Sequence, residues 1–229
     1  AAALLAITSA NAATSFTDRS AFIAQTSPQG AIDFENAQAG SSFAGQDLTV
    51  GNMALSGGVD DFFTLNLIAP AGSCIGFNLS FFQIDGSQFA CSFVDPEADL
   101  RIDFNAPVTA WGADFRDIAD DDRRTKLSFY DDDDALLADY VAEGFNEADQ
   151  SFIGLDFMGA EASYLIFSFI TGPQDISNSD VFGMDNVLFS TARGMTPNPV
   201  PVPPAMLLFA SAGAVFAGLG KARSAKSAH

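Results

Sequence analysis

Alternation of apolar and polar side chains recurs along the middle of this chain and limits its fold more than any other feature. In residues 100–104, the apolar residues Leu100, Ile102 and Phe104 are separated by charged residues. A period of two places successive side chains on opposite faces of a β-strand, whereas a helix requires a period of 3.6. The middle of the chain is therefore predicted to form strands.

Short segments of this kind follow one another and are separated by turn-forming Gly, Asn, Asp and Pro residues. Such spacing is typical of an all-β sandwich, and the 23 phenylalanines supply the bulk of a core. A short helix is predicted over residues 17–25, where Thr17 can cap the first turn and Phe22 can face inward. The sequence thus predicts an all-β domain over residues 14–190 with one N-terminal helix. The predicted strands cover residues 31–34, 47–55, 62–68, 74–82, 88–93, 100–104, 108–115, 127–130, 136–141, 151–156, 165–169 and 184–189.

The last thirty residues form a segment in three parts, preceded by a predicted linker over residues 191–199. A proline cluster comes first, an uncharged 16-residue run over 205–220 follows, and the basic residues Lys221, Arg223 and Lys226 come last. A helix over the run would span roughly 24 Å, less than the ~30 Å hydrocarbon core of a membrane. Basic residues after the run predict a cytoplasmic C-terminus. Residues 200–229 are therefore predicted to enter a membrane as a short hydrophobic helix.

This arrangement resembles the PEP-CTERM class of bacterial sorting tails, and most closely its VPLPA-type variant. The motif stands here as Val200, Pro201, Val202, Pro203 and Pro204. Val202 replaces the Leu of that variant, and Pro204 replaces its Ala. The resemblance implies an exosortase-type processing enzyme as a partner and release towards the cell surface or the extracellular matrix. Cleavage of the tail and its retention as a membrane anchor are both open.

The first thirteen residues also indicate export. They form an apolar stretch that ends in Ala10, Asn11 and Ala12. This A-x-A pattern resembles a signal-peptidase site, so residues 1–13 are predicted to be a truncated signal peptide that is cleaved after Ala12 or Ala13.

The region between the two end segments is strongly acidic. Residues 14–199 hold 7 of the 10 basic residues and all 29 acidic residues, which gives a net charge of −22. Nucleic acid and anionic lipid are therefore excluded as favourable partners, whereas cations are favoured.

The two cysteines, Cys74 and Cys91, lie 17 positions apart. In an exported chain such a pair predicts a disulfide, which is worth about 3 kcal/mol through loop closure. Metal ligation and thiol catalysis are disfavoured because the only histidine is His229.

The two ends of the predicted domain resemble the first and last strands of jelly-roll modules. The strings are SFTDRSAFIAQ and AIDFEN near the start and VFGMDNVLFS near the end. The resemblance implies a jelly-roll-like sandwich and a structural calcium shared by an early acidic residue and a late Asp. The corresponding residues here are Glu35 and Asp185. The alternative is that both residues only fill polar positions at turns or strand ends.

Two acidic clusters, residues 117–122 and 131–134, fall between predicted strands. Neither matches a calcium loop of the D-x-[DN]-x-[DN]-G type, because Gly is absent from the sixth position. Both clusters are predicted to be solvated loops, with loose divalent binding as the alternative.

Three functions from different classes agree with these features. The favoured one is a non-catalytic, exported β-sandwich that associates with the cell surface or matrix. The second is a carbohydrate-binding module that holds extracellular polysaccharide on a concave face or on Trp111, although a tryptophan inside an alternating strand is more often a core residue. The third is a secreted hydrolase that uses a pair of carboxylates. Enzyme activity is not expected, because the chain lacks a G-x-S-x-G motif and the phosphate-binding and dinucleotide-binding motifs.

Overall fold

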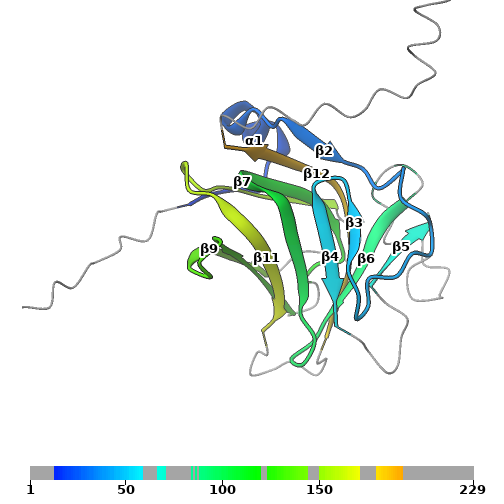
Figure 1. Ribbon diagram of the computed structural model, residues 1–229. Helices are drawn as coiled ribbons and strands as arrows, with labels where there is room; N and C mark the ends of the chain where they lie inside the picture. Colours follow the sequence, from blue (N-terminus) through cyan, green and yellow to red (C-terminus); the bar gives the residue numbers. More distant parts are fainter. Residues whose placement is uncertain are drawn as a thin grey trace, which may run out of the picture. The chain divides into compact units, whose positions relative to one another are not determined.

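Antiparallel strands account for most of the structure, a computed structural model (Figure 1). It describes residues 13–58, 66–70, 84, 86, 88–119, 123–143, 150–170 and 179–192. Residues 1–12 of the predicted signal peptide, the strand at 74–82, Cys74 and the C-terminal segment lie outside these ranges. Within them, no helix is long and apolar enough to cross a membrane.

The elements follow one another with a single helix among the strands. They are β1 (Thr14–Phe16), α1 (Arg19–Thr26), β2 (Gly30–Ile32), β3 (Leu48–Val50), β4 (Met53–Gly57), β5 (Leu67–Pro70), β6 (Gln88–Val94), β7 (Leu100–Arg116), β8 (Arg124–Tyr130), β9 (Leu136–Glu143), β10 (Gln150–Asp156), β11 (Ala162–Phe169) and β12 (Asp180–Thr191).

The 17-residue strand β7 belongs to both halves of the sheet. Its first part, up to Phe104, pairs with β4 and β11, and its second part, from Val108, pairs with β10 and β12. The pairing with β11 continues past a register shift to Val108, which lies opposite Ala162. One half has the order β3–β4–β7–β11–β8–β9. The other has the order β5–β6–β12–β7–β10–β1, and β2 also pairs with β12. The sequence predicted two separate strands here, because Asn105 and Pro107 interrupt the alternation.

The two halves face each other across an aromatic core. Trp111 on the second part of β7 is fully buried. Its ring lies 5.7 Å from that of Phe129 on β8 and 6.2 Å from that of Phe167 on β11, between ring centroids. The prediction of an all-β, jelly-roll-like sandwich with a short N-terminal helix is therefore confirmed.

Helix α1 starts later than predicted, and Asp18 caps it instead of Thr17. The Asp18 carboxylate accepts a hydrogen bond of 2.7 Å from the backbone N–H of Ala21, and Ser27 ends the helix in the left-handed region. A carboxylate at this position satisfies a free N–H and interacts favourably with the helix dipole.

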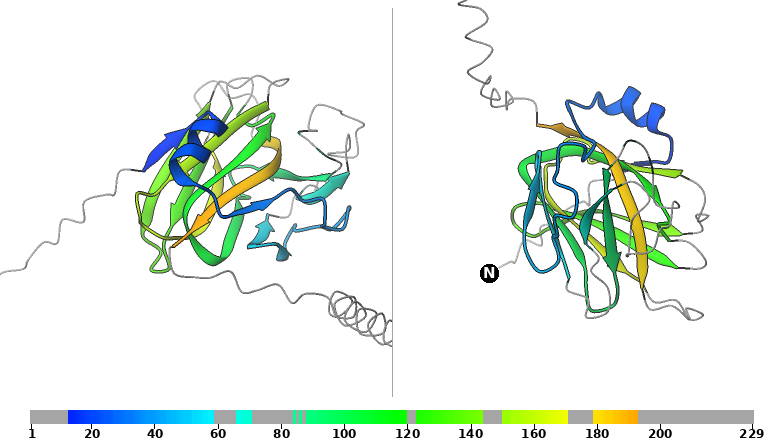
Figure 2. Two further views of the ribbon diagram at one scale, coloured as in Figure 1. Left: turned by 90° about the horizontal axis from the view of Figure 1, so that it is seen from above. Right: turned by 90° about the vertical axis from the view of Figure 1, so that its right-hand side faces the viewer.

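The helix covers the outer face of the β10–β7–β12 half (Figure 2). Phe22 is fully buried there, with its ring 5.4 Å from that of Phe152 and 5.6 Å from that of Phe16. Ala110 and Leu188 complete this small apolar cluster. The inward orientation predicted for Phe22 is correct.

The sequence also predicted one strand over residues 47–55, where the structure has the hairpin of β3 and β4. The chain reverses at Gly51, whose φ of +58° lies in the left-handed region that favours glycine. The acidic run 131–134 forms the turn between β8 and β9, where Asp131 Oδ1 accepts hydrogen bonds from the backbone N–H groups of Asp133 and Ala135.

Candidate functional site

An acidic pocket lies where the start of the domain meets its last strand. It has a volume of about 150 Å³, and its lining consists of Asp33, Glu35, Gly86, Asp185 and Asn186. Glu35 and Asp185, the two residues that the jelly-roll resemblance singled out, therefore line the same pocket although 150 positions separate them.

Strand pairing brings the two residues together. β2 pairs with β12, with Ile32 opposite Val187, so the chain leaves β2 beside residues 185 and 186. Asp33 Oδ1 then accepts a hydrogen bond of 3.2 Å from the backbone N–H of Glu35. This local turn directs the chain towards the N-terminal end of β6.

Glu35 is held by the residue that opens β6. The backbone N–H of Gln88 donates to Glu35 Oε1, and its side-chain Nε2 donates to the Glu35 carbonyl, each at 3.0 Å. Gly86 approaches so closely that a Cβ atom at this position would overlap Glu35 Oε1, and its φ of +67° also favours glycine. Position 86 therefore has to be glycine for the carboxylate to keep its place.

A β-bulge shapes the other side of the pocket. Asp185 pairs with Asp114 on β7 and Leu188 pairs with Gly112, so β12 holds one extra residue between these pairs. Asn186, with a φ of 50°, lies within the bulge, and its N–H donates a 2.7 Å hydrogen bond to Asp185 Oδ1. Bulges of this kind redirect side chains and are frequent at functional sites.

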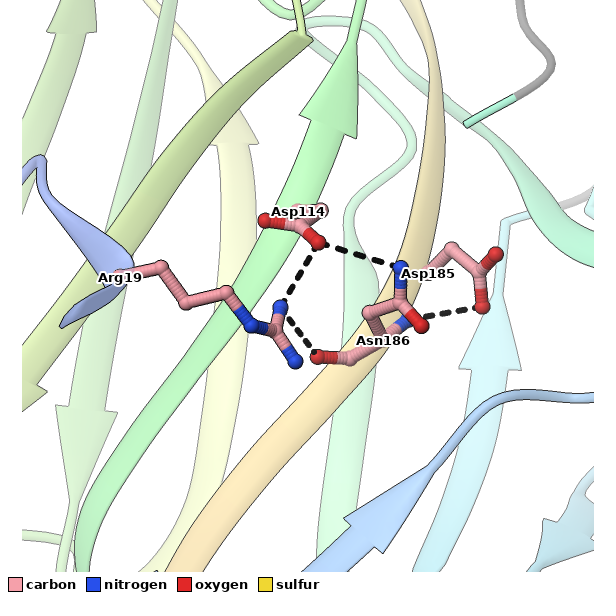
Figure 3. Close-up of polar contacts among 4 residues, drawn as sticks. All are labelled: Arg19, Asp114, Asp185 and Asn186. Atoms are coloured by element: carbon pink, nitrogen blue, oxygen red, sulfur yellow. Dashed lines mark hydrogen bonds and ion pairs between the residues drawn. The ribbon is translucent and has the colours of Figure 1, made fainter. Parts of the chain in front are cut away.

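Asp114 and Asp185 lie opposite each other on neighbouring strands, but of the two only Asp114 contacts a basic side chain within the described part of the chain. Arg19 on α1 forms a 2.7 Å ion pair with Asp114 Oδ2, and the Asn186 side chain donates to the same oxygen at 3.1 Å. Figure 3 shows the Asp185 carboxylate pointing away from Arg19 and Asp114. Among the described residues, no basic side chain forms an ion pair with Asp185.

Burial raises the pKa of Asp185 from 3.8 to about 7. The hydrogen bond from Asn186 N–H opposes this shift, while the negative charges of Glu35, Asp114 and Asp33 add to it. Only 1% of the residue is exposed. The pocket thus holds a carboxylate whose negative charge is poorly compensated by the protein.

The raised pKa predicts how the stability of the metal-free protein depends on pH. The folded state binds the Asp185 proton more tightly than the unfolded state, so stability is expected to fall as the pH rises from about 4 to about 7 and then to level off. We expect Asp185 to contribute a loss of about 4 kcal/mol, at about 1.4 kcal/mol for each pH unit between these limits, or roughly 8 to 16 °C in melting temperature.

Thermal melts in EDTA at several pH values are compared for the wild type and Asp185→Asn. The difference between the two slopes of melting temperature against pH measures the contribution of Asp185. The charged residues near Asp185 are the same in both proteins, so the difference between them reports Asp185 itself. These residues are Arg19, Asp33, Glu35 and Asp114. Equal slopes would contradict the assignment of the raised pKa to Asp185.

The lining suits a hard cation better than a soft one, because every side-chain ligand it offers is an oxygen. The described residues contain no group of three or more His, Cys, Asp or Glu side chains arranged to hold a metal ion. A cation in the pocket would therefore use the carboxylates of Asp185 and Glu35 together with backbone oxygens and water. Calcium accepts such mixed oxygen ligands.

Other predicted residues have different outcomes. Cys91 on β6 is buried between Phe89 and Phe93, and no described cysteine is free, but Cys74 lies outside the described residues, so the pairing stays a prediction. Trp111 is fully buried, so its interpretation as a core residue is confirmed and the alternative of a sugar-stacking platform is wrong. The sorting motif and the basic residues Lys221, Arg223 and Lys226 lie outside the described residues.

Several residues around the pocket were not predicted from the sequence. Asp33 precedes Glu35 by two positions, and Asn186 follows Asp185 directly, so their proximity to the predicted residues was an available signal. Nothing local in the sequence indicated that Arg19 and Asp114 lie near the pocket, because 95 positions separate the two partners of this ion pair.

Neither a protein-family model nor a curated protein matches this chain. Among solved structures, the K2 cleaved adhesin domain of Lys-gingipain is similar at 13% identity and a TM-score of 0.43, over 71% of this chain and 98% of that one. The enzymatically active domain of bacteriophage CBA120 tailspike protein 4 shares 16% identity at a TM-score of 0.35, over 66% of this chain and 21% of its own. TmCBM61, solved with β-1,4-galactotriose, shares 11% identity at a TM-score of 0.34, over 69% and 94% of the two chains. Similarity at this level carries no information on ligand or activity.

Proposed function

We propose that this chain is an exported, non-catalytic β-sandwich protein of the cell surface or extracellular matrix, and that its acidic pocket holds a structural Ca²⁺. One observation supports the calcium proposal above the others. Asp185 is buried and lines the pocket, yet the nearby cation, Arg19, pairs with Asp114 instead. A bound cation would supply the positive charge that Asp185 lacks.

The structural role follows from where the ligands lie. Glu35 follows β2 near the start of the domain, and Asp185 lies in β12 near its end. A Ca²⁺ bound by both would crosslink segments that are distant in sequence, and so would stabilise the folded state by mass action.

The size of the pocket favours a cation over a polymeric substrate. A volume of about 150 Å³ corresponds to roughly five water molecules at ~30 Å³ each, whereas pockets for organic ligands usually measure about 300 to 1,000 Å³. The small volume therefore supports metal binding by the carboxylate pair over hydrolysis of a polymer. Carbohydrate binding through Trp111 is not proposed, because that side chain is buried.

Export and sorting rest on the two end segments of the sequence. The predicted signal peptide, the proline motif that begins at Val200 and the basic residues from Lys221 onward support delivery through the inner membrane. The proposed partners are an exosortase-type enzyme, the membrane during sorting, and the polysaccharide-rich surroundings of the mature protein. The intact mass of the mature protein from its own cells tests this proposal: loss of the residues after the motif supports sorting, and an intact tail in the membrane fraction indicates an anchor.

Isothermal titration calorimetry with Ca²⁺ tests the pocket. The wild-type chain is expected to bind one Ca²⁺ more tightly than the variants Glu35→Gln and Asp185→Asn. Asp133→Asn removes one negative charge from the exposed turn between β8 and β9 and is the matched control. Equal binding by all four proteins would overturn the proposal.

A further inference from the structure

We infer that Arg19, which does not line the pocket, positions Asp185 for cation binding through Asn186, so that the docking of α1 and the affinity for the cation are coupled. This inference rests on the proposed calcium site. It adds a residue from the N-terminal helix to that site and predicts that the helix responds to the cation.

A continuous path of hydrogen bonds connects the helix with the pocket (Figure 3). Arg19 Nη1 donates to Asp114 Oδ2 at 2.7 Å and to the Asn186 carbonyl at 3.1 Å. The Asn186 side chain donates to the same Asp114 oxygen, and its backbone N–H donates to Asp185 Oδ1. Asp185 then lines the pocket.

Asn186 is the central residue of this path, because three of its polar groups have different partners. Its carbonyl binds Arg19, its side-chain amide binds Asp114, and its N–H binds Asp185. The residue adopts a left-handed conformation, which is less favourable for a residue other than glycine and needs support from its surroundings. Loss of the Arg19 contacts would therefore loosen the bulge that orients the Asp185 carboxylate.

The helix in turn depends on few contacts. It has eight residues, and an isolated helix of this length is unstable in water. Phe22 anchors it in the apolar cluster, and Arg19 adds the ion pair and lies over the ring of Phe152 at 5.7 Å. Fixing the bulge by a cation at Asp185 would favour the docked helix, and by linkage the docked helix would favour the cation to the same degree.

The direction in which the affinity for the cation changes when Arg19 is removed distinguishes a positioning role from simple charge repulsion. If Arg19 acted only as a nearby positive charge, its removal would reduce repulsion and strengthen cation binding. If it acts by positioning, its removal weakens binding. Arg19→Met keeps the apolar contact with Phe152 while it removes the charge and the hydrogen bonds.

Calorimetry with Ca²⁺ on the full chain compares the wild type, Arg19→Met and Arg101→Met. Arg101 lies on the part of β7 that pairs with β4 and β11 and binds Asp103, so Arg101→Met removes the same charge without touching the path. We expect Arg19→Met to weaken Ca²⁺ binding about fivefold or more and Arg101→Met to leave it unchanged. Unchanged or tighter binding by Arg19→Met would overturn the inference while the calcium site stands.

Hydrogen exchange provides the reciprocal measurement. Ca²⁺ is expected to slow amide exchange in α1 (Arg19–Thr26) of the wild type and of Arg101→Met, and to have no such effect in Arg19→Met. Calcium binding without slower exchange in α1 would contradict the coupling alone. A wild-type chain that binds no Ca²⁺ would overturn the calcium proposal and the coupling together.

Discussion

Trp111→Ala is expected to lower the free energy of unfolding by about 3 to 5 kcal/mol, the usual cost of removing a large aromatic side chain from a core. Trp111 is fully buried, and its ring contacts Phe115, Phe129 and Phe167. The substitution removes aromatic contacts between the two halves of the sheet and leaves a cavity between them. Urea denaturation followed by far-ultraviolet circular dichroism measures the loss, since the variant lacks the only tryptophan of the chain.

Trp111→Phe is the matched comparison for this prediction. It keeps an aromatic ring in the core and is expected to cost clearly less than the alanine variant, because less volume is lost. A loss below about 1 kcal/mol for Trp111→Ala would show that the side chain is not a core residue. Any effect of Trp111→Ala on carbohydrate binding has to be judged against this loss of stability.

Saturating Ca²⁺ is expected to raise the free energy of unfolding by about 4 kcal/mol when its concentration exceeds the dissociation constant about 1,000-fold. For a domain of this size the corresponding rise in melting temperature is roughly 8 to 16 °C. The reason is that the unfolded chain does not hold Glu35 and Asp185 together. Thermal melts followed by Trp111 fluorescence, in Ca²⁺ and in EDTA, measure the difference.

Asp185→Asn is expected to abolish this response and to make the protein more stable than the wild type in EDTA near neutral pH. The amide oxygen can still accept the hydrogen bond from Asn186 N–H, while the buried negative charge is gone. Asp133→Asn, in the exposed turn, is expected to respond to Ca²⁺ as the wild type does. A wild-type melting temperature that is the same in Ca²⁺ and in EDTA would count against the site.

The class of fold was predictable because it follows from local pattern. Alternation in segments such as residues 100–104 sets which face is buried, regardless of the partner strand. Features that depend on long-range pairing were missed. The continuity of β7 through Pro107 depends on neighbouring strands along both of its parts. The start of α1 was misplaced because Thr17 and Asp18 are both good capping residues, and only the geometry selects Asp18.

The site was predictable only in part for the same reason. A resemblance at the two ends of the domain pointed to Glu35 and Asp185, but no local pattern relates Arg19 to Asp114 or to Asn186. The bulge that separates Asp185 from Leu188 is a mismatch between two strands, so it exists only once β12 is paired with β7.

The participation of β7 in both halves of the sheet has a mechanical consequence. A force that slides one half of the sheet over the other is transmitted through the covalent backbone of β7. This strand is hydrogen-bonded to β4 and β11 in one half and to β10 and β12 in the other. One half can separate from the other only when its hydrogen bonds to β7 break. For a protein proposed to work outside the cell, where flow and adhesion exert force on it, this arrangement makes the two halves resist shear as one unit.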